Sequence, residues 1–541
     1  MAMAALVFHG AVALRSSLLP PLPALASPHL APAMSLSLCH GIPPIVSGSL
    51  RTTKHKEKEM MDKDKDRKKT GVSWGCDPRS IENGTLLQDW LTNEGLAKQK
   101  LVLDRVESGG RGLVATQSLR QGERLLFVPS KFLISADSEW GCAETGKIIK
   151  EAGLPEWPTL AIFLISEASR GTTSPWFPYF VTLPKTPSSI LQWTEDEVNI
   201  WLTASPVREK ALECIRDVTE TYRDLRATIF SKHPDVFPSQ VYTLEAFKWA
   251  FGILFSRLVR LPSLGKLALV PWADMLNHSP QVDAFLDFDQ SNGKSVVFVT
   301  DRAYQPGEQV FISYGKRPSG ELLLAYGFIP SEFNAHDYVE LEMGLDNEDP
   351  SYDAKLTALE EHGLSSPQRF PVRKDGFPAQ LLAYARLISS RVSNPAQLSL
   401  MARAATEAKA TANDTADVEA ILSAEEETDA YERVLAVCEN SIAEYTSFLE
   451  ANEESDDEAT DIVDSSARLS RTRMLRQLAV DLCKNEQRIL FRLQYILRTD
   501  LRGLRTLPGT ESMSGGAKGK AKRANGGLFN LFKWNIDILE K

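Results

Sequence analysis

The stretch VPWADMLNH, residues 270–278, sets three polar residues, Asp274, Asn277 and His278, into an otherwise apolar run. Such a run is expected to be buried, and a buried polar group without a partner costs about 1–3 kcal/mol. Each polar residue therefore needs a partner on the backbone or on a polar ligand. Core packing or capping also produces an Asn-His pair beside an apolar run, so this stretch alone does not indicate an enzyme.

Two further stretches follow in the next 50 residues. GEQVFISYG, residues 307–315, contains a Pro-Gly turn and then a predicted strand over 309–314 that ends in Tyr314. GELLLAYGF, residues 320–328, reads as a short helix and a turn. A tyrosine that ends a strand can direct its hydroxyl into a cavity, although ordinary packing is the commoner reason for one.

Together, in this order, the three stretches resemble the SET-domain lysine methyltransferases, whose signature is an Asn-His pair and a downstream strand ending in tyrosine. The third stretch resembles the branch of the Rubisco large-subunit methyltransferase, which also contains histidine methyltransferases. The resemblance implies S-adenosylmethionine as cofactor, no metal, and a protein substrate with a target lysine. The sequence leaves open whether the methyl acceptor is lysine or histidine.

The same resemblance implies an α+β fold: a SET-domain β-fold with a helical insert, then an all-helical substrate-binding domain of the Rubisco-methyltransferase type. It assigns the catalytic role to Tyr314, whose hydroxyl would orient the acceptor amine. The cofactor-binding residues that it implies are Gly110, Arg111, Gly112, Ser256, Arg257, Asp274, Asn277, His278, Tyr314, Tyr326 and Phe328.

The position of Arg257 in the sequence also predicts that its side chain needs a partner. Arg257 closes the apolar run 247–257, so a buried guanidinium there needs a carboxylate or a backbone partner. A structural salt bridge and the carboxylate of the cofactor are both open. The first cofactor loop has Gly109 and Arg111 where the branch often has an acidic and an apolar residue.

Composition narrows the function classes. The 541 residues carry a net charge of −10, which argues against general coating of nucleic acid. Six widely separated cysteines form no C-x-C or C-x-x-C pair, so a structural zinc site is not expected. No segment reads as a membrane span of about 20 apolar residues.

The domain organisation follows from changes in composition along the chain. An acid-free, serine-rich start over residues 1–53 predicts a chloroplast transit peptide. A charged linker is predicted over 54–73, the SET domain over 74–345 with its helical insert at about 135–250, and the helical domain over 346–505. A flexible tail of basic and apolar residues is predicted over 506–541.

Two long apolar stripes, beginning at Tyr431 and at Leu475, predict paired helices joined by an acidic loop over 450–464. The second helix is rich in arginine on its polar side. A solvated face explains this charge, and weak or indirect contact with nucleic acid is the alternative.

Runs around Trp74, over 251–263 and over 304–315 also resemble SET-domain proteins associated with the plastid-encoded RNA polymerase. This resemblance implies a plastid nucleoid location, with that polymerase and its associated proteins as partners in plastid gene expression. Three hypotheses remain: a lysine methyltransferase in that complex, a SET-fold scaffold with little turnover, or a methyltransferase of Rubisco or aldolase.

Overall fold

The computed structural model describes residues 72–77, 79–96, 99–106, 110–290, 294–406, 421–453 and 466–506. It divides into two units. The N-terminal unit contains the described residues up to 203 and residues 207–334; the C-terminal unit contains 204–206 and the described residues from 335 onward. The predicted transit peptide, nearly all of the charged linker, most of the acidic loop and the tail from residue 507 lie outside the described residues.

Short strands form several small sheets in the N-terminal unit. The strands are β1 (Leu101–Asp104), β2 (Gly112–Ala115), β3 (Arg124–Pro129), β4 (Val259–Leu261), β5 (Lys266–Ala268), β6 (Asn277–His278), β7 (Leu286–Asp289), β8 (Ser295–Val299) and β9 (Phe311–Ile312). β1–β2 and β4–β5 are antiparallel pairs, β3–β8–β7 is an antiparallel three-stranded sheet, and β6 pairs with β9 in parallel. The strand predicted over 309–314 is thus only two residues long.

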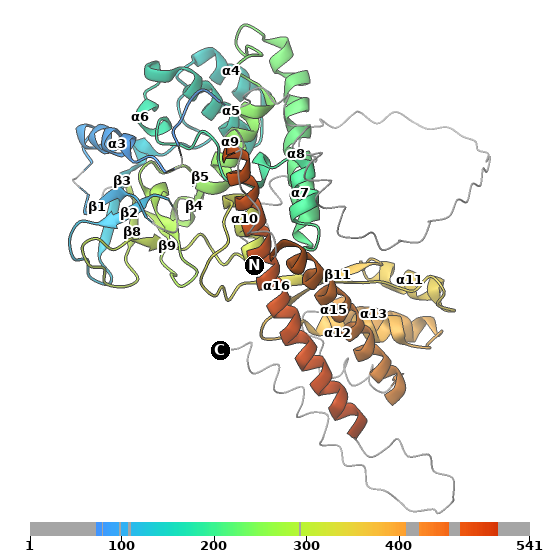
Figure 1. Ribbon diagram of the computed structural model, residues 1–541. Helices are drawn as coiled ribbons and strands as arrows, with labels where there is room; N and C mark the ends of the chain where they lie inside the picture. Colours follow the sequence, from blue (N-terminus) through green and yellow to red (C-terminus); the bar gives the residue numbers. More distant parts are fainter. Residues whose placement is uncertain are drawn as a thin grey trace, which may run out of the picture. The chain divides into compact units, whose positions relative to one another are not determined.

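The helices of this unit are α3 (Glu82–Asn93), α4 (Ala143–Ala152), α5 (Glu156–Ser169), α6 (Phe177–Phe180), α7 (Glu195–Trp201), α8 (Val207–Thr228), α9 (Leu244–Arg257) and α10 (Ser319–Tyr326). Short 3-10 turns include η4 (Ile190–Gln192) and η7 (Ala273–Met275). Helices also make up most of the segment 135–250. Figure 1 shows α4, α5, α8 and α9 gathered beside the strands of this unit.

α9 explains how the helical part supports the strands. Nearly every residue from Ala246 to Phe255 is buried, because the helix is apolar on all sides and packs against α5. The Thr243 side chain caps the first turn by accepting the Ala246 N–H at 3.1 Å. Arg257 is the last residue of α9, and the chain then enters β4.

The C-terminal unit is built around helices, as the sequence predicts. They are α11 (Tyr352–Glu361), α12 (Ala379–Ser389), α13 (Pro395–Thr406), α15 (Ala424–Glu453) and α16 (Ser466–Thr506). The apolar stripes of α15 and α16 are buried, and these two helices pack on each other.

One feature of the predicted all-helical domain is wrong. β11 (Gln368–Arg373) lies within residues 346–505 and pairs antiparallel with β10 (Tyr338–Met343). The Val339, Leu341, Phe370 and Val372 side chains are buried. Two strands separated by a helix give no local turn signal, because their pairing depends on distant contacts, Val339 with Val372, 33 residues apart, for example.

Candidate functional site

The parallel pair β6–β9 fixes the centre of the site. Asn277 pairs with Phe311, and His278 pairs with Ile312, so Tyr314, two residues after the end of β9, is held close to His278. The Tyr314 N–H donates to His278 Nδ1 at 3.1 Å. On its other side the β9 segment reaches β2, where the Val310 N–H donates to the Leu113 carbonyl at 2.9 Å.

Tyr314 lies within an aromatic stack. Its ring stacks on His278 at a centroid distance of 5.1 Å and on Tyr326 at 4.6 Å. Phe328 contacts the edge of Tyr326 at 6.2 Å and lies 6.3 Å from His278. Four of the predicted site residues therefore form one contiguous aromatic wall.

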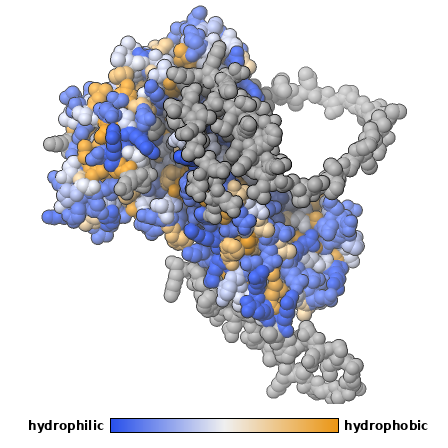
Figure 2. Space-filling view, in the orientation of Figure 1, coloured by the Kyte–Doolittle hydropathy of each residue, from blue (hydrophilic) through white to orange (hydrophobic). Residues whose placement is uncertain are grey.

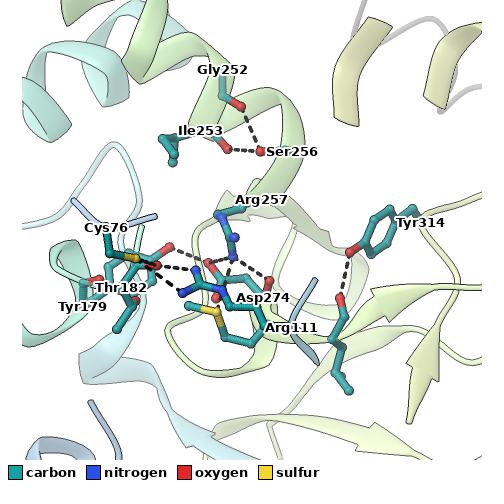
Figure 3. Close-up of polar contacts among 12 residues, drawn as sticks. Cys76, Arg111, Tyr179, Thr182, Gly252, Ile253, Ser256, Arg257, Asp274 and Tyr314 are labelled. Carbon is teal, nitrogen blue, oxygen red and sulfur yellow. Dashed lines mark hydrogen bonds and ion pairs between the residues drawn. The ribbon is translucent and has the colours of Figure 1, made fainter. Parts of the chain in front are cut away.

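The Tyr314 hydroxyl donates a hydrogen bond of 2.7 Å to the Leu276 carbonyl (Figure 3). Burial raises the pKa of Tyr314 well above its ordinary value, and the neighbouring Tyr326 adds to this shift. The hydroxyl is therefore neutral throughout the physiological range, and it cannot act as a phenolate base.

Asn277 joins this wall to residues 110–112, called here the glycine loop. Its Nδ2 donates to the Arg111 carbonyl at 2.9 Å and to Gln309 Oε1 at 2.7 Å. A Cβ at Gly112 would lie 2.5 Å from Gln309 Oε1 and 2.7 Å from Asn277 Nδ2. A glycine is required at this position because any side chain would displace Asn277.

Three charged groups lie beside the wall: Asp274 and Arg111 are buried, and Arg257 is partly buried. Arg257 Nη1 donates to the Asp274 carbonyl at 2.8 Å and lies 3.7 Å from Asp274 Oδ2. Tyr179 Oη donates to the same Oδ2 at 2.5 Å. Arg111 donates to the Ser80 carbonyl at 2.7 Å, to the Thr182 carbonyl and to Cys76 Sγ at 3.5 Å.

The electrostatics of this group follow from its burial. Burial raises the pKa of Asp274, and Arg257 opposes that rise. Burial and then the positive charge of Arg257 lower the pKa of Arg111. For Arg257, burial disfavours the charge, but the charge of Asp274 leaves the pKa above its ordinary value.

Two buried polar atoms of the group have no partner among the described residues: Arg257 Nε and Asp274 Oδ1. The Asp274 side chain is 1% exposed, so bulk water does not reach it. A ligand that offers both a hydrogen-bond acceptor and a donor would satisfy the two atoms. The amino-acid end of a cofactor has these groups.

The remaining predicted residues are placed differently. The Ser256 hydroxyl donates within its own helix, to the Gly252 carbonyl at 2.8 Å, and not to the charged group. Gly110 has a φ of +71°, which favours glycine. The sequence prediction missed Tyr179, Gln309 and Cys76, which contact Asp274, Asn277 and Arg111 respectively.

Within the described part of the chain, no group of three or more His, Cys, Asp or Glu side chains is arranged to hold a metal ion. No helix of that part is long and apolar enough to cross a membrane.

Comparison with known proteins places these features in context. Residues 110–315 match the family described as SET domain, and residues 346–490 match the family described as Rubisco LSMT substrate-binding. The chain is similar to a solved structure of Rubisco LSMT bound to AdoMet, with 27% identity and a TM-score of 0.60, over 78% of this chain and 93% of that one.

Two curated relatives come from plant chloroplasts. The large-subunit N-methyltransferase of Rubisco from Pisum sativum is 31% identical over 59% of this chain and 66% of that protein. The fructose-bisphosphate aldolase-lysine N-methyltransferase from Arabidopsis thaliana is 29% identical over 58% of this chain and 65% of that protein. The chain thus spans just under two thirds of the length of these relatives.

Proposed function

We propose that this chain, which joins a SET domain to a Rubisco LSMT substrate-binding domain and is homologous to Rubisco LSMT-like methyltransferases, is an S-adenosylmethionine-dependent protein-lysine methyltransferase of the chloroplast. The observation that carries the proposal is the β6–β9 pair, which brings Asn277 and His278 beside Tyr314. The chloroplast location rests on the predicted transit peptide and on the chloroplastic relatives.

The residues present fit this cofactor. Arg257 Nε and Asp274 Oδ1, buried and unpaired, suit the carboxylate and ammonium of its amino-acid end. The glycine loop over 110–112 and the Asn277 amide would hold the adjoining part of the molecule. When bound, S-adenosylmethionine supplies a methyl group on a positively charged sulfur.

The chain's own residues prepare the acceptor. Because the Tyr314 hydroxyl donates its proton to the Leu276 carbonyl, its oxygen is free to accept a hydrogen bond from the acceptor amine. The stacked rings of His278 and Tyr326 fix the Tyr314 ring, so alignment costs little at the moment of transfer. Loss of water around an acceptor lysine that enters beside these buried rings disfavours its charged ammonium, which lowers the lysine pKa from its reference value of about 10.4 toward the neutral, nucleophilic form.

Calorimetric titration of S-adenosylmethionine into the full chain tests the proposal. We expect micromolar binding that is lost in Asn277→Ala, because that variant removes the bond between the β6–β9 pair and the glycine loop. Tyr314→Phe should keep binding but reduce methyl transfer from labelled cofactor to stromal protein by at least about 100-fold. Absence of binding by the wild-type chain would refute the methyltransferase and favour a SET-fold scaffold.

The methyl acceptor is the finer part of the proposal. The relatives support Rubisco or aldolase as the type of substrate, a lysine of an abundant chloroplast enzyme. A role with the plastid-encoded RNA polymerase and its associated proteins rests on the sequence runs around residues 74, 251–263 and 304–315 alone. Labelled-methyl transfer to purified polymerase complex, compared with purified Rubisco and aldolase, separates the two.

A further inference from the structure

The charged group beside the aromatic wall contains two cations and one anion. Arg111 comes from the glycine loop, Arg257 from the end of α9, and Asp274 from η7. Arg111 is 6% exposed, and the Arg257 side chain is 16% exposed. Tyr179, which touches the carboxylate, adds no negative charge, because burial and the charge of Asp274 raise its pKa well above the ordinary value.

Arg111 is held in place by neutral partners. Its guanidinium donates to the carbonyls of Ser80 and Thr182 and to the sulfur of Cys76. These bonds fix the position of the cation but leave its charge uncompensated, since a buried cation is stabilised by an anion far more than by neutral acceptors. Figure 3 shows the guanidinium groups of Arg111 and Arg257 converging beside Asp274.

The consequence is an excess of one positive charge next to the unpaired Arg257 Nε. Positive charges repel each other, and burial strengthens that repulsion because the local dielectric constant is low. A ligand carboxylate that enters here interacts favourably with two guanidinium groups. A ligand that brings only an ammonium is repelled by both.

We propose that Arg111 is a specificity-determining residue, which together with Arg257 makes the site select adenosyl ligands that carry a carboxylate over those that lack one. The inference rests on the proposed function, because it takes the amino-acid end of the cofactor as the occupant of the charged group. It assigns to the Arg111 side chain a role separate from that of the backbone carbonyl, which accepts from Asn277.

The test compares two non-reactive probes by calorimetry on the full chain: S-adenosylhomocysteine and its decarboxylated analogue. The measured quantity is the dissociation constant of the decarboxylated analogue divided by that of S-adenosylhomocysteine. A large ratio means that the site prefers the ligand with the carboxylate. Arg111→Met removes the charge and keeps most of the side-chain volume. Arg111→Gln is a second variant that keeps hydrogen-bond donors for the Ser80 and Thr182 carbonyls, so that folding is preserved. We expect either variant to reduce the ratio about tenfold, while Arg111→Lys retains most of it.

The matched control is Arg79→Met. Arg79 is exposed and its side chain lies against the same loop, where a Cβ on Gly110 would be 3.1 Å from Arg79 Cγ. Because Arg79 is outside the buried group, the ratio should not change in this variant.

An unchanged ratio in Arg111→Met and Arg111→Gln, with S-adenosylhomocysteine still bound, would overturn the inference and leave the methyltransferase standing. An equal fall in Arg79→Met would also overturn it, because the effect would then belong to surface charge. Failure of the wild-type chain to bind either probe would overturn both proposals.

Discussion

The two units bury polar atoms in opposite ways. Six of the seven unpaired buried side-chain atoms in the part of the chain that the structure describes belong to the N-terminal unit, Arg257 Nε and Asp274 Oδ1 among them. In the C-terminal unit the buried Lys355 ammonium uses all three donors, to Asp349 at 2.6 Å and to the carbonyls of Ile388 at 3.1 Å and Ser390 at 2.6 Å.

This difference separates binding from structure. A saturated buried charge such as Lys355 holds helices together, since every one of its bonds ends within the same unit. Buried atoms without a partner, such as those of Arg257 and Asp274, keep capacity for a ligand. Burial of a charge therefore indicates a site only where its hydrogen bonds are incomplete.

Lys355→Met should give the largest loss of stability. The substitution leaves Asp349 and two buried carbonyls without their donor, at a cost of about 3–5 kcal/mol. In the wild-type chain burial opposes the ionisation of Asp349, but the hydrogen bond from Lys355 keeps the pKa of Asp349 below its ordinary value. Hydrogen exchange over α11–α13, measured with chemical denaturation of the full chain, reports the loss.

The control for this variant is Arg391→Met. Arg391 pairs with Glu425 at 3.0 Å on the surface of the same unit, with both side chains about two-thirds exposed. Exchange over α11–α13 should be the same as in the wild type. If Lys355→Met also left the hydrogen exchange over α11–α13 unchanged, the three hydrogen bonds of the buried Lys355 ammonium would not be what stabilises this unit.

Gly327→Ala tests the N-terminal unit, where the wall depends on backbone conformation. Gly327 lies between Tyr326 and Phe328 with a φ of +75°, and a Cβ there would be 1.9 Å from the Ser188 carbonyl oxygen. We expect a loss of about 2–4 kcal/mol and a weaker near-ultraviolet dichroism signal from the displaced rings.

Gly122→Ala is the matched control. Its φ of +76° is nearly the same, but a Cβ there meets nothing within 4 Å. It should cost only the conformational strain, about 1 kcal/mol. Equal losses in the two variants would show that the approach to Ser188 is unimportant.

Several of the site residues predicted from the sequence lie close together along the chain. Asp274, Asn277, His278 and Tyr314 fall within 41 residues, and the structure brings them to one place through β6 and β9. The apolar run of α9 also predicted that Arg257 needs a partner, and Asp274 provides it.

What the sequence could not give depends on distant contacts. Tyr179 lies 95 residues before Asp274, in a helix of four residues with no polar pattern to mark it. Lys355 looks like an ordinary helical lysine until α12 supplies the Ile388 carbonyl 33 residues later. The pairing of β10 with β11 was hidden for the same reason.

Glu486 gives the C-terminal unit a pH dependence. This buried α16 carboxyl accepts from Tyr445 at 2.8 Å and Ser205 at 3.1 Å. Burial raises the pKa of Glu486 from 4.5 to about 8. The hydrogen bonds from Ser205 and Tyr445 oppose this rise, and the negative charges of Asp337 and Glu340 add to it. The native state thus holds the proton more tightly than the unfolded chain, so stability falls as pH rises between these values, by at most about 1.4 kcal/mol per pH unit.

Glu486→Gln, which resembles the protonated acid, should flatten this dependence. We expect a near wild-type melting temperature at about pH 4, and an excess over wild type that grows as the pH rises and is largest at about pH 8 and above. Glu439→Gln, on the partly exposed side of α15, should keep the wild-type slope. Parallel curves for Glu486→Gln and wild type would mean that Glu486 ionises without cost in the folded chain.

The smallest effect is expected on the basic side of α16. Figure 2 shows a mostly hydrophilic visible face on the C-terminal unit. Arg498 and Arg505 pair with Glu439 at 2.7 Å and Glu432 at 2.6 Å on α15, and all four side chains are substantially exposed. Solvent screening limits such pairs, so Arg498→Ala should change stability by less than about 1 kcal/mol.

The same variant decides between a solvated face and a nucleic-acid surface. Because Arg498 and Arg505 are already paired with glutamates, we expect α16 to bind nucleic acid no better than the rest of this acidic chain. Fluorescence anisotropy with labelled single- and double-stranded DNA at 50 and 200 mM salt, about the range over which phosphate contacts lose most affinity, measures this. Tight, salt-dependent binding that weakens in Arg498→Ala would show that exposed pairs in the C-terminal unit, and not only unpaired buried atoms in the N-terminal unit, can serve a ligand.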